Sequence, residues 1–313
     1  MIANLNRSTK SMITIVLLFA AATGLAAQNT GKPLGMVADV EGSVTIQRGA
    51  AKERAQLADL LFAGDRITTA ANSKATFSFC PGGDKNERIS LNAGSTIVIS
   101  AAAVQQSGGT PAVRGGRARC TLPEVALGKR ELESIGAVSA RGSPPISLYV
   151  GGAISTTRPL FTWAHVPAVR DYTLSLRPQG GGKDIWTWTH TGEASEIRLP
   201  ETIAELTPGT YTWTLTGRAN GKIVAQQMAN FEVKPDAALS SAGAIATAAA
   251  DTLSQLELAA AFENARYYAE AAAIYRALRA KNANDPKFTR HLLWLYRTAG
   301  LFAAYNEEVE RSK

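Results

Sequence analysis

The sequence predicts a multidomain protein in which two all-β regions precede an α-helical tail. Short segments with alternating apolar and polar residues, separated by turn-forming residues, fill much of residues 34–145. A second set of alternating segments, rich in aromatic residues, fills residues 146–235. Residues 251–313 follow a helical period instead, and they resemble themselves at a fixed shift. A chain of 313 residues is long enough for two or three domains with separate cores.

The N-terminus has the features of an export signal. Arg7 and Lys10 precede an apolar run over residues 12–26, and Gly24 and Ala26 supply the small residues that signal peptidase requires. We therefore expect a cleaved signal peptide over 1–26 and a periplasmic or otherwise exported protein of the cell envelope. A retained anchor is the alternative, although the run is shorter than the roughly 20 residues of a membrane span. No later segment predicts a transmembrane helix.

Charge and cysteine content agree with export. Without Arg7 and Lys10 the formal net charge falls from +7 to +5, a mild bias that permits contact with acidic envelope polymers. Oxidising compartments favour paired cysteines, so we expect a disulfide between Cys80 and Cys120, with two unpaired structural thiols as the alternative. Two cysteines far from any histidine do not make a metal site, and we expect neither a metal nor a cofactor.

Residues 35–100 predict a small antiparallel β-roll or sandwich. The expected strands lie in "GMVADVEGSVTIQRG", "DRITT", "KATFSF", "ERISL" and "STIVIS", and turn residues separate them. We interpret Glu41-Gly42 as a hairpin-like turn. Gly64-Asp65 is interpreted as a turn before a strand, in which the aspartate bonds to local backbone amides. Asp65 has no neighbouring histidine or second carboxylate that would favour a catalytic or metal-binding role.

Residues 101–145 are rich in glycine and arginine and are interpreted as a loop. An unfolded run such as "VRGGRAR" can bind nucleic acid, but an exported chain rarely meets any, so no nucleic-acid partner is expected. If Cys120 pairs with Cys80, the bond would tie this loop to the end of the "KATFSF" strand. The following "CTLPEV" would then continue as a strand or a sheet edge.

The order of these features resembles the FecR-type domain over about residues 34–100. The residues that carry the resemblance are Gly35-Met36-Val37, Gly42-Ser43-Val44, Gly64-Asp65-Arg66-Ile67-Thr68-Thr69, Ser73-Lys74-Ala75-Thr76-Phe77 and Ile89-Ser90-Leu91. The best-known members are periplasmic sensors that relay an outer-membrane transport signal to an anti-sigma system. They have a cytoplasmic region ahead of a membrane span, whereas only a short segment precedes the apolar run here, so the signalling role is not carried over.

Residues 146–235 predict a β-sandwich of about seven strands. Aromatic and aliphatic residues share strand faces in four groups: Phe161 and Trp163; Tyr172, Leu174 and Leu176; Trp186 and Trp188; Tyr211, Trp213 and Leu215. The phrases P-x-F-x-W, Y-x-L-x-L and L-x-P-G-x-Y-x-W-x-L resemble a fibronectin type III or related immunoglobulin-like domain. That resemblance implies that Trp163 is a core residue and Tyr211 a corner residue.

Trp186 and Trp188 leave two interpretations open. If their face is exposed, the two rings form a flat platform on which sugar rings could stack. If it is buried, they fill the core of the sandwich, as aromatic residues on one face of an alternating strand usually do.

The tail follows an Ala-rich linker over residues 236–250. A shift of 34 residues aligns six apolar pairs: Leu258/Leu292, Ala259/Leu293, Phe262/Tyr296, Tyr268/Phe302, Ala271/Tyr305 and Tyr275/Val309. This period resembles the tetratricopeptide repeat, and "YAEAAAIYRAL" is similar to its second helix. Gly300 falls at the turn inside the second repeat, whereas the usual proline is displaced to Pro286 and Tyr305 is large for its position.

Two repeats are fewer than the three or so that stand alone, so we expect the helices to pack on the sandwich, on a partner or on another copy of the chain. The candidate partner-binding residues are Tyr268, Tyr275, Tyr296 and Phe302.

No catalytic constellation is present in the sequence. His165, His190 and His291 are scattered, and the first two are expected at the surface. No metalloprotease, phosphate-loop, dinucleotide-binding or nucleophile-elbow motif occurs, and "GRANGKI" is a hairpin turn. We therefore expect a non-catalytic envelope scaffold or adaptor that binds a protein partner through its helical tail and β-domains. The alternatives are a peptidoglycan- or polysaccharide-binding protein and a FecR-like component of envelope signalling.

Overall fold

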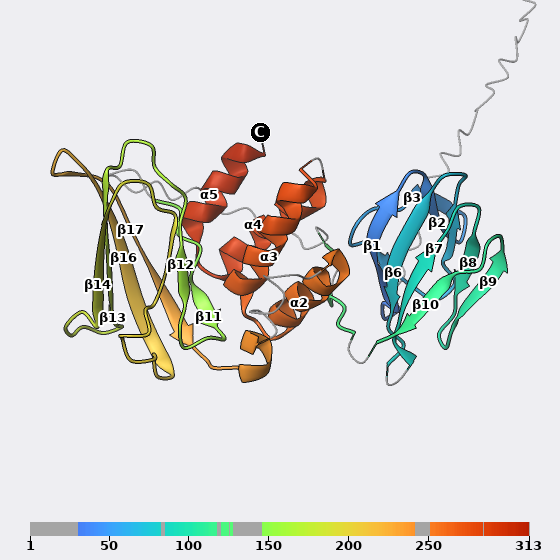
Figure 1. The fold of residues 1–313 in the computed structure, drawn as a ribbon, viewed down its shortest axis with the longest axis horizontal. Helices are drawn as coiled ribbons and strands as arrows, with labels where there is room; N and C mark the ends of the chain where they lie inside the picture. Colours follow the sequence, from blue (N-terminus) through green and yellow to red (C-terminus); the bar gives the residue numbers. More distant parts are fainter. Residues whose placement is uncertain are drawn as a thin grey trace, which may run out of the picture. The chain divides into compact units, whose positions relative to one another are not determined.

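A computed structural model describes residues 31–82, 85–117, 120–124, 126–127, 146–241, 251–283 and 285–312. The expected signal peptide and most of the expected linker lie outside these ranges. Residues Gly31–Lys313 belong to one compact unit. Within its described part, strands β1–β10 form a first β-domain, β11–β17 a second, and α2–α5 follow them in the chain (Figure 1). The predicted fold class, two sandwich-like β-regions and a helical tail, is confirmed.

The first β-domain consists of two five-stranded antiparallel sheets. One sheet has the strand order β10-β7-β6-β1-β4 and the other β3-β2-β5-β8-β9. The strands are β1 (Gly35–Glu41), β2 (Val44–Arg48), β3 (Ala51–Arg54), β4 (Leu60–Leu61), β5 (Arg66–Thr69), β6 (Lys74–Phe79), β7 (Glu87–Leu91), β8 (Thr96–Ile99), β9 (Val104–Gly108) and β10 (Val113–Gly116). Alternating residues of both sheets, including Val44, Phe77 and Ile97, fill the core between them.

Two expectations about this domain were wrong. Glu41-Gly42 is not a hairpin turn, because β1 pairs with β4 and β6 in one sheet while β2 pairs with β3 and β5 in the other. The segment therefore carries the chain from one sheet to the other. The Gly/Arg-rich stretch is not a simple loop either, since it contains β9 and β10, which complete the two sheets. Backbone pairing with β7 and β8 outweighs the low strand propensity of its glycines.

The second β-domain contains seven strands in the described residues. They are β11 (Gly152–Ile154), β12 (Leu160–Thr162), β13 (Asp171–Pro178), β14 (Trp186–Thr191), β15 (Glu196–Arg198), β16 (Gly209–Ala219) and β17 (Lys222–Val233). Five form a sheet with the order β11-β17-β16-β13-β14, and β12 pairs with β15. The long β16–β17 hairpin turns at Asn220-Gly221, as "GRANGKI" predicts.

Aromatic residues dominate the core of the second domain. Trp213 is fully buried, and its ring centroid lies 5.0 Å from that of Phe161. Trp163 is buried beside Tyr172. The hydroxyl of Tyr211 donates to the carbonyl of Thr207 at 2.9 Å, the tie between a strand and its preceding corner that is characteristic of such sandwiches.

The helices repeat with a period of 34 residues. Helices α2 (Thr252–Asn264) and α3 (Tyr268–Lys281) form the first pair, and α4 (Pro286–Thr298) and α5 (Phe302–Arg311) form the second. Asp251 caps α2 by accepting from the Ser254 amide, and Asp285, 34 positions later, caps α4 by accepting from the Lys287 amide. The 34-residue spacing of the aligned apolar residues is therefore also the spacing between the N-terminal caps of α2 and α4.

The apolar faces of the helices share a core with the first β-domain. One cluster joins Leu256 and Leu295 of the helices to Met36, Ala38 and Leu60 of the β-strands and their connections. Tyr149 and Ala153, from the start of the second domain, pack against the same cluster. Packing of the helices against the second β-domain agrees with the expected support from the sandwich, whereas the core that they share with the first β-domain was not expected.

Candidate functional site

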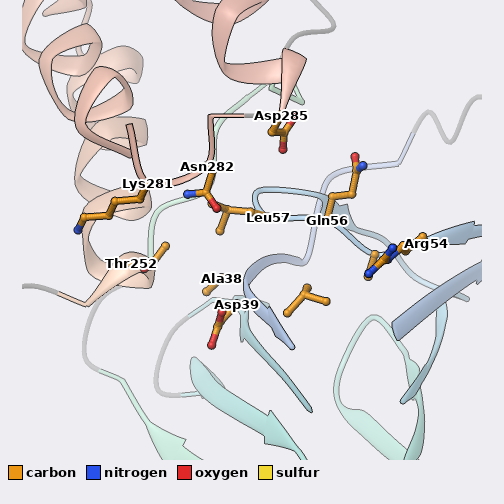
Figure 2. A pocket seen from close by; sticks show the side chains of 11 residues that line it. Ala38, Asp39, Arg54, Gln56, Leu57, Thr252, Lys281, Asn282 and Asp285 are labelled. Carbon is orange, nitrogen blue, oxygen red and sulfur yellow. The ribbon is translucent and has the colours of Figure 1, made fainter. Parts of the chain in front are cut away.

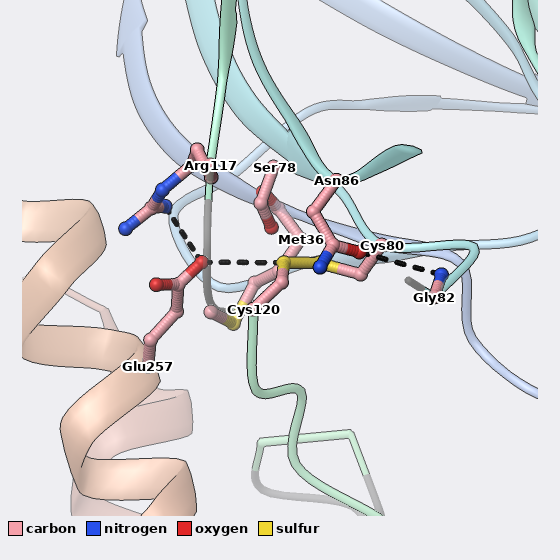
Figure 3. Close-up of a disulfide and its surroundings, with 8 residues drawn as sticks. All are labelled: Met36, Ser78, Cys80, Gly82, Asn86, Arg117, Cys120 and Glu257. Carbon is pink, nitrogen blue, oxygen red and sulfur yellow. Dashed lines mark hydrogen bonds and ion pairs between the residues drawn. A yellow bond between two sulfur atoms is a disulfide. The ribbon is translucent and has the colours of Figure 1, made fainter. Parts of the chain in front are cut away.

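The Cys80–Cys120 disulfide lies where the first β-domain meets helix α2 (Figure 3). The two Cα atoms are 5.7 Å apart, and Cys120 Sγ is 3.4 Å from Glu257 Oε1. The Arg117 guanidinium donates to the same oxygen at 2.7 Å. Burial raises the pKa of Glu257 from 4.5 to about 7, against the opposing charge of Arg117. The expected bond is thus present, and it brings Arg117 next to the helix.

The two sulfur atoms and a Glu257 oxygen lie within 4.8 Å of one another. Such a group could in principle hold a metal ion, but metal binding requires thiolates. Sulfur atoms that are bonded to each other do not supply them. Residues 120–124, the described part of "CTLPEV", form no strand, contrary to the expectation for this segment.

Ion pairs add a second link between the first β-domain and the helices. The Lys287 ammonium, in the first turn of α4, donates to the carbonyl of Leu57 and to Asp59, each at 2.8 Å. Arg88 of β7 pairs with the α2 cap Asp251 at 2.9 Å, where the two side chains are 44% and 45% exposed. The Lys287 side chain is 13% exposed, so its pair is the better shielded of the two.

A polar cleft of about 410 Å³ lies beside this joint (Figure 2). On one side it is lined by β1 and the segment that follows β3, and on the other by the start of α2 and the α3–α4 turn. The lining residues are Ala38, Asp39, Val40, Arg54, Ala55, Gln56, Leu57, Thr252, Lys281, Asn282 and Asp285. Asp39, Arg54, Gln56 and Lys281 are exposed, so both charge signs and amide groups face solvent. Sequence reasoning missed this cleft because the residues of its two sides are at least 195 positions apart in the chain.

The second β-domain meets the helices through Glu270, in the first turn of α3. The carboxylate accepts from the Ser155 amide at 3.0 Å and from the Ser155 hydroxyl at 2.6 Å. Burial raises the pKa of Glu270 to about 7, although both hydrogen bonds favour the ionised form. Close approach completes the joint: a Cβ on Gly151 would lie 2.6 Å from Leu301 Cδ2, so a larger residue would require the Leu301 side chain to shift.

Tyr149 anchors the same joint by its ring and its hydroxyl. The Arg276 guanidinium lies 3.9 Å from the ring centroid, and the hydroxyl donates to Glu307 of α5 at 3.0 Å. Burial and the nearby Glu307 raise the pKa of the Tyr149 hydroxyl. One side chain thereby contacts two helices through different chemistry.

A buried polar pair lies inside the helical region itself. His291 Nε2 is 2.8 Å from Glu263 Oε2, and both side chains are almost fully inaccessible. The ring of Tyr275 packs edge-on against His291, with centroids 4.9 Å apart. His291 links α2 to α4 across the repeat. The sequence shows no local signal for this pair because its members are 28 residues apart.

The four expected partner-binding residues divide into two groups. Tyr275 and Tyr296 are each 1% exposed and belong to the core, so the expectation that they contact a partner needs correction. Both rings belong to the core cluster that the helices share with the first β-domain. Phe302 is 55% exposed, and Tyr268 is half-buried with its ring edge-on to Trp294.

The two tryptophans of β14 also differ in how deeply they are buried. Trp186 is 8% exposed and its ring lies near that of Phe161, so an exposed platform of two tryptophans is not present. Trp188 is half-buried and stacks in parallel on the exposed His190, with centroids 5.4 Å apart. His165, the other histidine expected at the surface, is half-buried beside the Tyr172 hydroxyl.

None of the helices in the described part of the chain combines the length and apolar composition needed to cross a membrane. Comparison with known proteins finds no matching family model and no matching curated protein. Among solved structures, the chain is similar to the chicken CNTN1 FN1-FN3 domains, with 7% identity, a TM-score of 0.24, and coverage of 65% of this chain and 57% of that chain.

A second structural match is an FMN-binding beta-glucuronidase from Facaelibacterium prausnitzii L2-6. Its identity is 10% and its TM-score 0.22, and the match covers 64% of this chain and 40% of that chain. The chain thus spans less than two thirds of either protein. Similarity at these TM-scores supports no conclusion about function.

Proposed function

We propose that the protein is an exported, non-catalytic scaffold of the cell envelope, in which a tetratricopeptide-like helical unit connects a FecR-like and a fibronectin III-like domain. The observation that carries the proposal is the shared core of the helices with the first β-domain, together with the Glu270–Ser155 joint to the second. Most of the apolar helix surface serves to hold the chain's own domains together. The disulfide supports the oxidising compartment that export provides.

The polar cleft is the proposed site for a protein partner. Arg54 and Lys281 offer cations, Asp39 offers an anion, and Gln56 and Asn282 offer amide groups to an extended backbone. An extended, charged segment of a partner would satisfy these groups better than a small apolar molecule. The mixed charge favours specificity and rate of association over high affinity.

Site-specific photo-crosslinking in the native envelope tests this assignment. A photoreactive residue in place of Gln56, which is exposed in the cleft, should give a discrete protein adduct. The Arg54→Glu, Lys281→Glu double variant should lose that adduct because it reverses both cations. The matched controls are a photoreactive residue at the exposed Thr189 of β14 and the Lys222→Glu variant on the β16–β17 turn. An adduct at Gln56 no stronger than at Thr189 would count against the cleft.

Removal of the whole helical tail would be a weaker test of the same proposal. Deleting residues 252–313 would expose Met36, Ala38 and Leu60, so loss of a partner could reflect loss of folding. Exposed side chains of the cleft can be changed without disturbing that core.

Binding of a polysaccharide is the second candidate, supported by the parallel Trp188–His190 stack on the edge strand β14. Exposed aromatic faces stack on sugar rings in many binding sites. Sedimentation with purified peptidoglycan should then decrease in Trp188→Ala and stay unchanged in Ile185→Ala, whose side chain is 38% exposed one residue before β14. Equal sedimentation of wild type and Trp188→Ala would eliminate this candidate.

A further inference from the structure

A buried carboxyl group lies against one sulfur atom of the Cys80–Cys120 disulfide. Glu257 Oε1 is 3.4 Å from Cys120 Sγ, and Figure 3 shows the glutamate reaching from α2 to the Cys120 side of the bond. Glu257 is 8% exposed, whereas both cysteines are half-buried. A disulfide has no S–H group to donate, so the carboxyl group becomes a hydrogen-bonding partner of Cys120 only when the S–S bond breaks.

Breaking the bond at Cys80 would place a negative charge where Glu257 lies. Thiol–disulfide exchange releases the departing sulfur as a thiolate, and exchange is faster when that thiolate is stabilised. A protonated carboxyl group can donate its proton to the thiolate, whereas a carboxylate would repel it. Burial raises the pKa of Glu257 to about 7, so its protonated form is well populated near neutral pH. Geometry and protonation state therefore suit a proton donor to Cys120.

Three other charged groups act on the Glu257 proton. Arg117, which follows β10, donates to the same oxygen at 2.7 Å and would stabilise the carboxylate that remains after proton transfer. Arg88 of β7 also favours the carboxylate, and Asp251, the cap of α2, favours the protonated form. Arg117 has the strongest influence of the three, so its replacement should raise the pKa of Glu257 further.

We propose that Cys80–Cys120 is a redox-active disulfide that reacts with dithiols, with Glu257 as the proton donor to Cys120. Attack falls on Cys80, because Glu257 and helix α2 lie against Cys120. One thiolate of the dithiol forms an S–S bond with Cys80 Sγ as the Cys80–Cys120 bond breaks. The electron pair of the broken bond leaves with Cys120 Sγ, which takes the proton of Glu257.

The second half of the reaction completes the transfer of two electrons from the dithiol to the protein. The remaining thiolate of the dithiol attacks its own sulfur in the mixed disulfide, and the dithiol closes into an oxidised ring. Cys80 leaves as a thiolate and takes a proton from water. Glu257 stays behind as a carboxylate that pairs with Arg117 and accepts from the new Cys120 thiol.

Reduction kinetics of the purified, oxidised protein test the proposal. Dithiothreitol is the dithiol, and maleimide labelling after an acid quench counts the free cysteines. The rate constant, corrected for the thiolate fraction of dithiothreitol, should fall about tenfold from pH 6 to pH 8 in the wild type, because Glu257 loses its proton over that range. In Glu257→Gln it should change less than about twofold. Arg117→Gln should move the midpoint of the wild-type profile to higher pH.

A matched control separates the Glu257 proton from a general effect of pH on the fold. Glu270→Gln removes the other buried glutamate with a pKa of about 7, which contacts Ser155, and should keep the wild-type profile. A flat wild-type profile, an unchanged profile in Glu257→Gln, an altered profile in Glu270→Gln or an unshifted midpoint in Arg117→Gln would overturn the proposal.

Two further measurements test the site and the route of attack. Mass spectrometry after brief treatment with glutathione and acid trapping should find the mixed disulfide on Cys80, and an adduct mainly on Cys120 would contradict the assigned roles. The reduction rate should rise in proportion to the dithiothreitol concentration. A rate that becomes independent of that concentration would show that the protein must unfold before it is reduced, and the proposal would fail.

Discussion

Asp65 shows how much one buried carboxylate contributes to the first β-domain. Its side chain is fully buried and accepts from Arg48 Nε and Nη2, each at 2.8 Å, and from the Phe62 amide. The bond to Asp65 raises the pKa of Arg48. The Phe62 amide is the local partner expected from the sequence, whereas Arg48, 17 residues away on β2, was not expected.

Replacing Asp65 by Asn should lower the free energy of unfolding by about 2 kcal/mol, because the amide keeps the local hydrogen bond and loses the bidentate pair. Urea unfolding followed by circular dichroism measures the change. Glu53→Gln on the exposed strand β3 is the matched control and should shift stability by under about 0.5 kcal/mol. A similar midpoint for Asp65→Asn and wild type would contradict this assignment.

At the scale of the elements, the two helical hairpins use the same turn with different residues. Gly300 has φ +72° between α4 and α5, and Arg266, its equivalent 34 positions earlier, has φ +67° between α2 and α3. In both turns the next amide bonds back to a helix carbonyl, Tyr267 to Phe262 and Leu301 to Tyr296. Arginine therefore occupies a backbone conformation that favours glycine.

Arg266→Gly is expected to stabilise the protein by about 0.5–1 kcal/mol, and Gly300→Ala to destabilise it by about 1 kcal/mol. A steric clash does not contribute to the expected loss of stability in Gly300→Ala, since a Cβ at this position would meet no neighbour within 4 Å. Thermal unfolding of the two variants checks both signs. Changes of the same sign in the two variants would show that side-chain contacts, rather than backbone conformation, control these turns.

The joint between α3 and the second β-domain should weaken as pH rises. Burial raises the pKa of Glu270 from 4.5 to about 7, so the folded protein binds more protons than the unfolded chain between these values. The stability from this group is complete below about pH 4.5 and is lost as pH rises through 7. Glu257 at the other joint has the same direction of shift.

Unfolding free energy should therefore fall by about 1–3 kcal/mol between pH 5 and pH 8. Glu270→Gln, which keeps an acceptor for Ser155, should reduce this slope, and Glu205→Gln on the sandwich surface should not. Denaturant titrations at several pH values measure how the unfolding free energy depends on pH. An unchanged slope in Glu270→Gln would remove Glu270 as the cause.

Sequence patterns predicted the elements better than they predicted the contacts between them. The alternation of apolar and polar residues in the strands and the 34-residue repeat of the helices are periodic patterns, so both can be recognised in the sequence. The cleft beside Lys281, the Glu263–His291 pair and the Glu270–Ser155 bond all join distant segments. Burial of Tyr275 was not predicted, and burial of Trp186 was one of two interpretations that stayed open, because an aromatic residue on one face shows that the face is apolar without showing what covers it.

At the scale of the whole molecule, the shared core should make the first β-domain and the helices unfold together. Leu256 of α2 is 1% exposed in the cluster that contains Met36 and Ala38 of β1. Leu256→Ala should cost about 2–4 kcal/mol and accelerate hydrogen exchange in β1 as well as in α2. Leu174→Ala, in the core of the second domain, should leave β1 exchange unchanged. Faster exchange in the helices alone would show that the two regions are independent.

The Cys80–Cys120 bond also determines how the protein responds to mechanical force. Cys80 follows β6 and Cys120 follows β10, so the bond closes β7–β10 into a loop with a sequence separation of 40. Tension applied through the chain on either side passes across the sulfur atoms and bypasses these four strands. About 140 Å of potential extension is thereby withheld until the bond is reduced. Four of the ten strands of the first β-domain thereby stay out of the line of force while the bond is intact.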